Sequence, residues 1–260
     1  MKIVCIICSF VLIINLSCNS EKQMLEKVKI NIFAAASTGP ALREIKKKIS
    51  NKFNISLSVA ASSTVARQVK NGANCDFVLL ADKEWMDYLQ RSNMIINNSR
   101  IDLLSNSLVL IAHVDKTFLL QEGLFSLSKS ISGKIALADP NFVPSGRYAK
   151  KILNSLGLFK EIKKKLLLAP DVRAALLWVE RKEVDAGIVY STDAKFSKKI
   201  KIIANIPNLL TVPILYPFAK CKNFNNPYNS LSVNKFLIIF HNIGKKIFVK
   251  HGFKYLNEKI

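Results

Sequence analysis

The chain has 260 residues, of which 50% are hydrophobic and 22% are charged. This balance excludes a disordered or collagen-like chain and predicts the buried core of one large α/β unit or two smaller ones. Lysine and arginine outnumber aspartate and glutamate by 39 to 18, a formal net charge of +21. Such a charge suggests nucleic acid or another anionic surface as a partner, but it also fits the lysine, isoleucine and asparagine content of an AT-rich coding sequence.

The first residues of the chain carry an export signal. One lysine precedes the apolar run 3–14, which is shorter than the ~20 residues that cross a bilayer as a helix. Small and polar residues follow, so the pattern predicts a signal peptide over residues 1–17. Cys18 stands where bacterial lipoproteins are cleaved and lipidated, with ordinary signal cleavage nearby as the alternative. We expect an exported protein, in the periplasm or at the cell-envelope surface, with a lipid anchor as its only membrane attachment.

Short apolar runs alternate with amphipathic segments from residue 28 onward. In chain order we expect a strand over 28–36, a helix over 41–53, a strand over 55–60, a helix over 65–70 and strands over 77–81, 108–112 and 134–138. A helix over 147–156, a helix over 172–181 capped by Asp171, strands over 186–190, 200–204 and 214–219, and helical segments over 233–240 and 245–249 follow. This alternation predicts mostly parallel sheets with helices on both faces.

Two cysteines remain beyond the signal region and Cys18. Cys75 and Cys221 would lie in an oxidising compartment, where a disulfide can form. They stand in separate apolar segments, so we expect a free buried thiol at each position. The mature chain has no C-x-x-C pair, and neither a zinc ribbon nor a redox motif is indicated.

Serines and other small side chains stand where predicted strands end and helices begin. Ser37 follows the first strand, Ser62 follows the second, and Ser145 and Val172 lie at the beginning of two later helices. Ligands of open α/β sheets bind beyond the carboxyl ends of strands, and helix N-termini offer unpaired N–H groups to anions. Any one of these turns is explained by ordinary helix capping, but several of them in one exported chain indicate an anion site.

Five stretches of the sequence carry a family resemblance: FAAASTGPALREI, AASSTVARQVKNGANCDFVLLADKEWMDYL, ADPNFVPSGRYAKKIL, DVRAALLWVERKEVDAGIVYSTDA and IFVKHGF. Together they resemble the molybdate-binding proteins of bacterial ABC importers, from about residue 28 to residue 253. The resemblance implies the type II periplasmic-binding-protein fold, with two α/β lobes joined by two hinge strands. Lobe 1 would comprise residues 28–106 and 217–260, and lobe 2 residues 107–216.

The resemblance also implies a set of residues that binds a tetrahedral oxyanion. Ser37 and Ser62 would each donate a hydroxyl and a backbone N–H, Ser145 and Val172 a backbone N–H, and Tyr190 its hydroxyl. No metal ligand or cofactor is implied, because molybdate would be held through its oxygens. The sequence departs from the family pattern at Ala61 and Ser145, where a Ser and an Ala are expected, and the extra Ser145 hydroxyl bears on anion preference.

The chemistry of these five residues is consistent with a doubly charged ligand. None of them ionises near neutral pH, so hydrogen bonds and dipoles would hold the charge. Each charge-assisted bond contributes about 1.5–3 kcal/mol net, and roughly seven such bonds support nanomolar to micromolar affinity. The set lacks an acceptor, which favours fully ionised oxyanions over hydrogen phosphate. Three arginines near these turns, Arg67, Arg147 and Arg173, are expected to point outward or to pair with acids.

Other functions are less well supported by the sequence. No metal-binding H-E-x-x-H, G-x-S-x-G or phosphate-binding loop occurs, so we expect no enzyme. The lysine runs lie on separate predicted helices and turns, which does not favour a nucleic-acid binder. We expect a monomeric receptor for molybdate and tungstate that works with an ABC permease and its ATPase subunits. Sulfate, with the same charge and shape but shorter bonds, stays open as the ligand.

Overall fold

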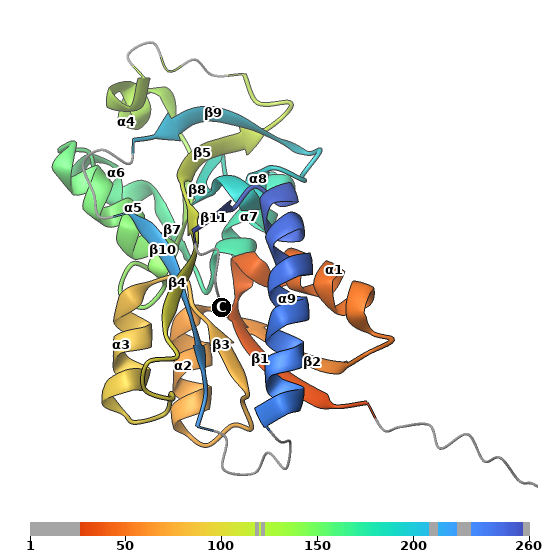
Figure 1. Ribbon diagram of the computed structural model, residues 1–260. Helices are drawn as coiled ribbons and strands as arrows, with labels where there is room; N and C mark the ends of the chain where they lie inside the picture. Colours follow the sequence, from red (N-terminus) through yellow and green to blue (C-terminus); the bar gives the residue numbers. More distant parts are fainter. Residues whose placement is uncertain (1–26, 118–119, 121–122, 208–212, 223–229, 257–260) are drawn as a thin grey trace, which may run out of the picture.

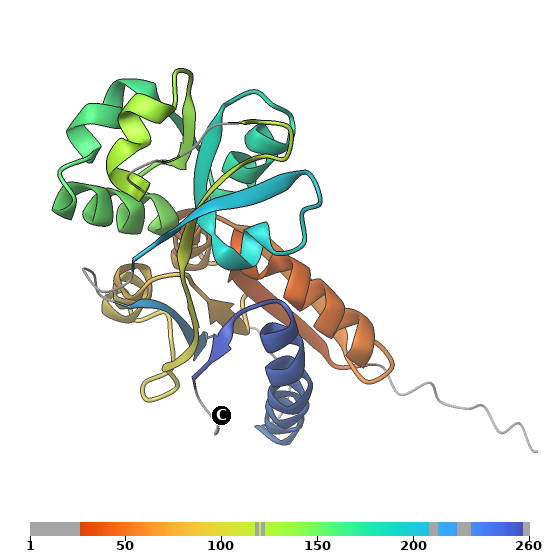
Figure 2. The same ribbon diagram turned by 90° about the horizontal axis from the view of Figure 1, so that it is seen from above.

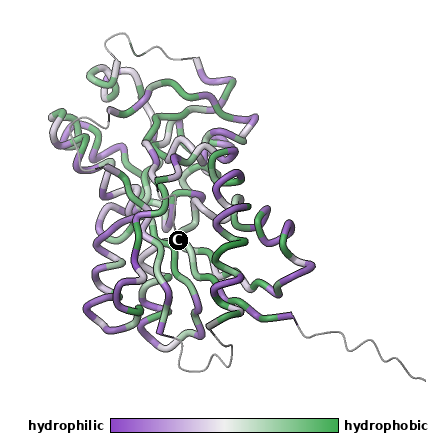
Figure 3. The backbone as a smooth tube through the Cα atoms, viewed as in Figure 1, coloured by the Kyte–Doolittle hydropathy of each residue, from purple (hydrophilic) through white to green (hydrophobic). Residues whose placement is uncertain are grey.

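The computed structural model describes residues 27–117, 120, 123–207, 213–222 and 230–256. The predicted signal peptide, residues 1–17, and Cys18 lie outside these ranges. In the described part of the chain, two β-sheets with helices packed against them form two lobes, one above the other in Figure 1. Hydrophobic residues follow the strands in the interior of both lobes (Figure 3).

The first lobe is built on a sheet with strand order β11-β4-β10-β3-β1-β2. Its strands are β1 (Lys29–Ala35), β2 (Asn54–Ala60), β3 (Phe77–Leu79), β4 (Ile101–Asn106), β10 (Ile214–Lys220) and β11 (Lys254–Tyr255). Its helices are α1 (Gly39–Ile49), α2 (Ser62–Lys70), α3 (Lys83–Arg91) and α9 (Ser230–Lys250), with the short 3-10 helix η1 (Ala36–Thr38) before α1. Alternate residues of β3 join different core clusters, so helices cover both faces of the sheet.

Helices α1 and α9 pack together on one face, as Figures 1 and 2 both show. The two helical segments predicted at the C-terminal end are one continuous helix, α9. Gly244 lies in the gap between those predicted segments, and a Cβ built there would lie 3.6 Å from Ile45 of α1. A Cβ at this distance would make an ordinary contact, so the glycine lies within the helix pair and does not end α9.

The second lobe is built on a sheet with strand order β7-β6-β8-β5-β9. Its strands are β5 (Leu108–His113), β6 (Ile135–Ala138), β7 (Leu166–Ala169), β8 (Ala186–Tyr190) and β9 (Ile200–Ile206). Its helices are η2 (Gly123–Ser126), α4 (Leu127–Ser130), α5 (Pro144–Ser155), α6 (Phe159–Ile162), η3 (Lys163–Lys165), α7 (Val172–Glu180) and α8 (Ser191–Ala194). None of the helices in the described ranges is both long and apolar enough to cross a membrane.

Parallel pairing is confined to three strands in each sheet. The expectation of mostly parallel sheets holds for β2-β1-β3 and β7-β6-β8, whereas β10 and β5 pair antiparallel with their neighbours. The reason lies in the crossing between the lobes. The chain leaves the first sheet along β4, passes through Ser107 into β5 of the second sheet, and returns along β10, which therefore runs opposite to β4.

The predicted lobe boundaries fall near these crossings. The boundary between residues 106 and 107 coincides with the end of β4, whereas the one between residues 216 and 217 falls inside β10. Because β10 pairs with β4 from Ile214 onward, the whole strand belongs to the first sheet. The division of the chain into lobes by residue number stays a prediction.

The two cysteines of the described chain lie side by side. Cys75 precedes β3 and Cys221 follows β10, and the antiparallel register that pairs Phe77 with Lys220 brings the two sulfurs to 2.7 Å. Both side chains are unbridged and buried in the same hydrophobic cluster. The expectation of separate apolar surroundings is therefore wrong. The pairing of β3 with β10 joins segments far apart in the sequence, which local patterns do not show.

Candidate functional site

A small pocket lies between the lobes and contains all five predicted site residues. Its volume is about 210 Å³, including the open space at its mouth. It is lined by Ala35, Ala36, Ser37, Ala61, Ser62 and Ala81 from the first lobe and by Val143, Pro144, Ser145, Asp171, Val172 and Tyr190 from the second. The folded chain thus brings together the turns that the sequence pattern singled out.

Three helices begin at this pocket. Ser62 is the first residue of α2, Ser145 the second of α5 and Val172 the first of α7. The N-cap residues of α2 and α5, Ala61 and Val143, make no side-chain capping bond. Backbone N–H groups in a first helical turn have no partner within the helix, and the helix dipole adds a partial positive charge there. The pocket therefore presents N–H donors from both lobes to a small anion.

Asp171, the carboxylate that lines the pocket, caps helix α7 as predicted. Its side chain accepts hydrogen bonds from the backbone N–H groups of Arg173 and Ala174, at 2.8 and 3.0 Å. The backbone N–H of Val172 is not among these bonds and remains at the open end of the helix. The charge of Asp171 is thus directed to the second and third residues of α7.

Two buried hydroxyls of the second lobe lack hydrogen-bond partners among the described residues. They are the Oγ of Ser145 and the phenol oxygen of Tyr190, and both residues are almost fully buried. Burial raises the pKa of Tyr190 well above its ordinary value, so the phenol is a neutral donor. An orphaned buried hydroxyl costs about 1–3 kcal/mol. A ligand with acceptor oxygens would remove this cost, so the two hydroxyls suit a ligand that carries acceptors.

The two serines of the first lobe are oriented by their neighbours. The Ser62 hydroxyl oxygen accepts the backbone N–H of Ala81 at 2.9 Å, which leaves the serine proton for a ligand. The Ser37 hydroxyl lies 2.9 Å from the Tyr216 hydroxyl, whose oxygen also accepts the side-chain N–H of Asn106 at 3.1 Å. With Asn106 donating to Tyr216, the phenol proton is available for Ser37, and the Ser37 proton is available for the pocket.

Tyr216 and Asn106 were not singled out by the sequence patterns, although both affect the site. Asn106 also donates to the Thr192 hydroxyl at 2.9 Å and accepts from Ser191 at 3.1 Å, so it connects the end of β4 to α8 in the second lobe. Burial raises the pKa of Tyr216 above its ordinary value, which keeps its hydroxyl neutral. A tyrosine at a strand interior resembles any core aromatic in the sequence, so its polar role appears only in the fold.

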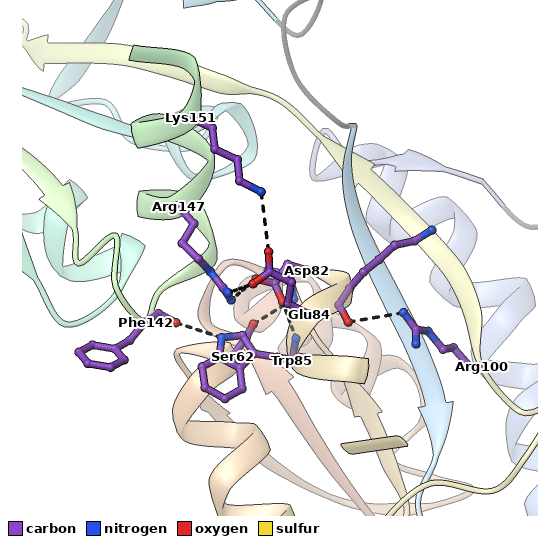
Figure 4. A network of polar contacts seen from close by, with 10 residues as sticks. Ser62, Asp82, Glu84, Trp85, Arg100, Phe142, Arg147 and Lys151 are labelled. Atoms are coloured by element: carbon purple, nitrogen blue, oxygen red, sulfur yellow. Dashed lines mark hydrogen bonds and ion pairs between the residues drawn. The ribbon is translucent and has the colours of Figure 1, made fainter. Parts of the chain in front are cut away.

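A group of charged side chains, close in sequence to the pocket residues Ala81 and Ser145, connects the two lobes (Figure 4). The guanidinium of Arg147, from α5, forms ion pairs with the carboxylates of Asp82 and Glu84 at the start of α3. The indole N–H of Trp85 donates to the backbone carbonyl of Phe142 at 3.0 Å. We call Asp82, Glu84, Trp85 and Arg147 the rim clasp, because its contacts run from one lobe to the other.

The arginines behave as the sequence analysis expected. Arg147 pairs with acids in the rim clasp, and Arg173 pairs with Asp193 at 3.0 Å. Arg67 lies over the Trp85 ring, 5.6 Å from its centroid. None of the three arginines lines the pocket, so an anion there would meet only uncharged donors.

The rim clasp contains a carboxyl group that titrates near neutral pH. Burial raises the pKa of Asp82 to about 6, because the loss of solvation outweighs the stabilisation by the Trp85 N–H and by Arg147. Asp82 is also the N-cap of α3, since its side chain accepts the Trp85 backbone N–H at 2.9 Å.

No group of three or more His, Cys, Asp or Glu side chains in the described ranges could hold a metal ion.

The beginning of α5 lies unusually close to the second sheet. A Cβ built on Gly146 would lie 1.9 Å from the carbonyl oxygen of Ala138, at the end of β6. Any side chain at this position would displace the first turn of the helix from the strand. Gly146 therefore fixes the position of the neighbouring Ser145 N–H at the pocket wall.

Comparisons with known proteins agree with this geometry. Residues 30–254 match the family of bacterial extracellular solute-binding proteins. The molybdate-binding protein ModA of Escherichia coli K12 is 38% identical over 208 residues, which are 78% of this chain and 81% of that protein. A putative ABC transporter substrate-binding lipoprotein of Bacillus subtilis, YvgL, is 32% identical over 94% of both chains.

Solved structures share the same architecture. The substrate-binding domain of a putative molybdenum ABC transporter from Clostridium difficile has a TM-score of 0.67 at 30% identity, covering 89% of this chain and 100% of that one. The sulfate-binding protein SubI of Mycobacterium tuberculosis H37Rv has a TM-score of 0.68 at 15% identity, covering 89% and 88% of the two chains. The two-lobed fold by itself is thus shared by proteins named for different anions. Together with the identities, these matches show that the chain belongs to the bacterial extracellular solute-binding proteins, in the family of the molybdate-binding protein ModA.

Proposed function

We propose that this protein is the exported receptor of an ABC importer and captures molybdate between its two lobes. Tungstate, which has the same charge and shape, would bind in the same way. The observation that carries the proposal is the pocket itself. Three helix N-termini and the hydroxyls of Ser37, Ser62, Ser145 and Tyr190 converge there without a charged side chain among the donors.

The donors account for the class of ligand. Backbone N–H groups and neutral hydroxyls stabilise a dianion by short charge-assisted bonds, each contributing about 1.5–3 kcal/mol net. A protonated anion such as hydrogen phosphate would need an acceptor for its proton. Asp171 lines the pocket, and its Oδ1 is committed to two backbone N–H groups of its own helix. The uncharged donors of the pocket therefore favour a fully ionised anion over a protonated one.

Binding from both lobes also accounts for capture and delivery. Ser37 and Ser62 belong to the first lobe, whereas Ser145, Val172 and Tyr190 belong to the second. An anion that bonds to both sets draws the lobes together by rotation about the crossing strands. The closed receptor would then present its cargo to a membrane permease with its ATPase subunits. A monomer is sufficient for this mechanism, and no nucleic acid or cofactor takes part.

The sequence supports an exported location for this receptor. We propose cleavage of the signal peptide at residues 1–17 and lipidation of Cys18, in keeping with the lipoprotein name of the Bacillus subtilis relative. The mature protein would then stay at the cell envelope, close to the permease. Mass spectrometry of the purified mature protein distinguishes a lipid-modified N-terminal cysteine from ordinary cleavage.

Calorimetric titration with molybdate, tungstate, sulfate and phosphate tests the ligand. We expect molybdate and tungstate to bind with nanomolar to micromolar dissociation constants, roughly 8–12 kcal/mol, and phosphate to bind far more weakly. Sulfate is the second candidate, because the added Ser145 hydroxyl brings one more donor to the pocket and its unpartnered Oγ suits any tetrahedral dianion. Tighter binding of sulfate than of molybdate would overturn the ligand while leaving the anion-receptor function in place.

A further inference from the structure

The rim clasp connects two segments that are each next to a pocket residue. On the first lobe, Asp82 directly follows Ala81, which lines the pocket and bonds to Ser62. On the second lobe, Arg147 lies two residues after Ser145. The positions of the clasp residues are therefore tied to the positions of the anion donors on both sides.

The clasp contacts form only between the lobes. Arg147 reaches from α5 to the start of α3, where it meets the carboxylates of Asp82 and Glu84, and Lys151 approaches Glu84 at 3.7 Å (Figure 4). The Arg147 guanidinium also lies over the Trp85 ring, 5.6 Å from its centroid. If the lobes separate, all of these partners are lost together and both ends of the clasp return to water.

Burial makes part of the clasp costly to break in the closed protein. The Asp82 side chain is 6% exposed and that of Arg147 is 19% exposed, whereas Glu84 is 60% exposed. Removing one member of a buried, hydrogen-bonded charge pair leaves the other charge unpaired, and such truncations act mainly on dissociation rates. The buried ion pair of Arg147 with Asp82 should thus control how often the lobes open, and the more exposed ion pair of Arg147 with Glu84 should contribute less.

We propose that Asp82, Glu84, Trp85 and Arg147 act as positioning residues that hold the lobes closed and slow the release of the bound anion. The inference rests on the proposed function, since it assumes an anion between the lobes. None of the four residues touches the ligand in this proposal. Their effect is on the lifetime of the closed state and not on the identity of the anion.

The test compares Arg147→Met with Arg181→Met, which removes an exposed arginine whose partner Glu183 lies 3.8 Å away on the same lobe. Release of radiolabelled molybdate into excess unlabelled molybdate gives the dissociation rate, and calorimetry gives the affinity. We expect Arg147→Met to speed release by roughly 10- to 100-fold with little change in association rate. Small-angle scattering of the molybdate-saturated variant should show a larger radius of gyration than the wild type. Arg181→Met should match the wild type in all three measurements.

A second variant guards against a folding defect. Glu84→Gln removes one exposed carboxylate and should speed release by a smaller factor than Arg147→Met. Release rates within twofold of wild type in both variants would overturn the clasp. If the wild-type protein binds none of the four anions, the proposed function fails and the clasp fails with it. A wild type that binds molybdate while both variants release it normally would refute the clasp alone.

An independent observation concerns the two cysteines. Their sulfurs lie 2.7 Å apart in a buried cluster, a short movement from the ~2.0 Å of a disulfide bond. The strands that carry them are held in register, because the Cys221 N–H donates to the Asp76 carbonyl at 2.9 Å. We infer that Cys75 and Cys221 are the site of a disulfide that forms as the exported chain folds.

The chemistry is a thiol–disulfide exchange. One cysteine thiolate attacks a disulfide oxidant and releases its thiol, and the second cysteine then displaces the other oxidant thiol from the mixed disulfide. Two protons and two electrons leave the cysteines, and the oxidant is reduced to two thiols. Burial raises the pKa of Cys75 above its ordinary value, so the thiol is unreactive once folded. Oxidation must therefore precede or accompany folding.

The bond would enclose a large loop that contains the second lobe, since 146 positions separate the two cysteines. Both cysteines belong to the first lobe, so the bond would not restrain hinge motion. Refolding the wild type with oxidised glutathione should yield a mass lower by two hydrogens and a melting temperature about 5–10 °C above that of the reduced protein. The double variant Cys75→Ala/Cys221→Ala should show no response to reductant. Two alkylatable thiols in the refolded wild type would refute the disulfide, whether or not molybdate binds.

Discussion

The pocket and the rim clasp lie next to each other between the lobes, yet they use opposite kinds of polar group. The pocket gathers neutral donors, and the hydroxyls of Ser145 and Tyr190 have no partner among the described residues. The clasp gathers full charges that pair with one another, with Arg147 between Asp82 and Glu84, and only the Nε of Arg147 among these charged groups is buried without a partner in the described part of the chain. Donors without partners would favour closure around an anion that supplies acceptors, whereas the paired charges of the clasp would hold the lobes together once they have closed. Selectivity and retention are thus assigned to different residues.

The largest effect should come from placing a charge inside the neutral pocket. Ser62→Asp would put a carboxylate beside the anion and remove the hydroxyl donor. Because Ser62 begins α2, an aspartate there suits the helix dipole and should preserve the fold. We expect molybdate affinity to fall by at least about 1,000-fold at an unchanged melting temperature, measured by calorimetry and thermal unfolding. Retention of affinity within tenfold would contradict a pocket that admits only one negative group.

A smaller change should follow from removing one donor without adding charge. Tyr190→Phe deletes a hydroxyl that is orphaned in the ligand-free protein, and affinity for molybdate should fall by about 10- to 100-fold, or 1–3 kcal/mol. The ligand-free protein should melt at the same or a slightly higher temperature, because no internal hydrogen bond is lost. A lower melting temperature with unchanged affinity would show that the hydroxyl serves the fold and not the ligand.

The smallest expected effect is a change in protein stability with pH, caused by the titration of Asp82 in the rim clasp. The pKa of Asp82 is about 6 in the folded protein and 3.8 ordinarily, so the folded state binds the proton more tightly. This contribution to stability is fully present below about pH 4 and is lost as pH rises through 6. Between pH 5 and pH 7, the wild type should therefore lose stability relative to Asp82→Asn, by a few degrees in melting temperature. The raised pKa of Asp193 acts equally in both proteins and cancels.

If the melting temperatures of the wild type and Asp82→Asn changed in parallel between pH 5 and pH 7, the pH dependence would not come from Asp82. The substitution keeps the side-chain carbonyl that caps α3, so a loss of helix capping should not confuse the comparison. The pKa values of Glu44, Asp115 and Asp185 are lowered by their lysine or histidine partners. Their contributions to stability therefore change at more acidic pH, outside the measured window.

Local patterns were sufficient where an element carries its own signals. The strands β1, β2 and β8 and the helices α1, α2, α5 and α7 were predicted, because apolar periodicity and caps such as Asp171 lie within each segment. The two-lobed fold and the five pocket residues came from the family resemblance, and the solved structures confirm the fold. That these five residues bind an anion stays a prediction.

Helix α3 was missed although it carries local signals, since Asp82 caps it and its buried residues Met86 and Leu89 are spaced for one helix face. The other missed features depend on distant partners. Strand β4 is defined by pairing with β10, which lies more than a hundred residues later in the chain. The contact of Cys75 with Cys221 and the ion pairs of Arg147 arise in the same way. The sequence alone does not show which segments the fold brings together.

The close seating of α5 on β6 through Gly146 has a consequence for how the receptor could diversify. The main chain of Gly146 packs against the Ala138 carbonyl so closely that a Cβ on the glycine would lie 1.9 Å from that oxygen, and this contact sets the position of the pocket wall. Exchanging side chains can change the donors on this wall, such as the Ser145 hydroxyl, but it cannot move the main chain. Relatives that accept a larger or smaller anion should therefore differ in helix placement or in the angle of closure.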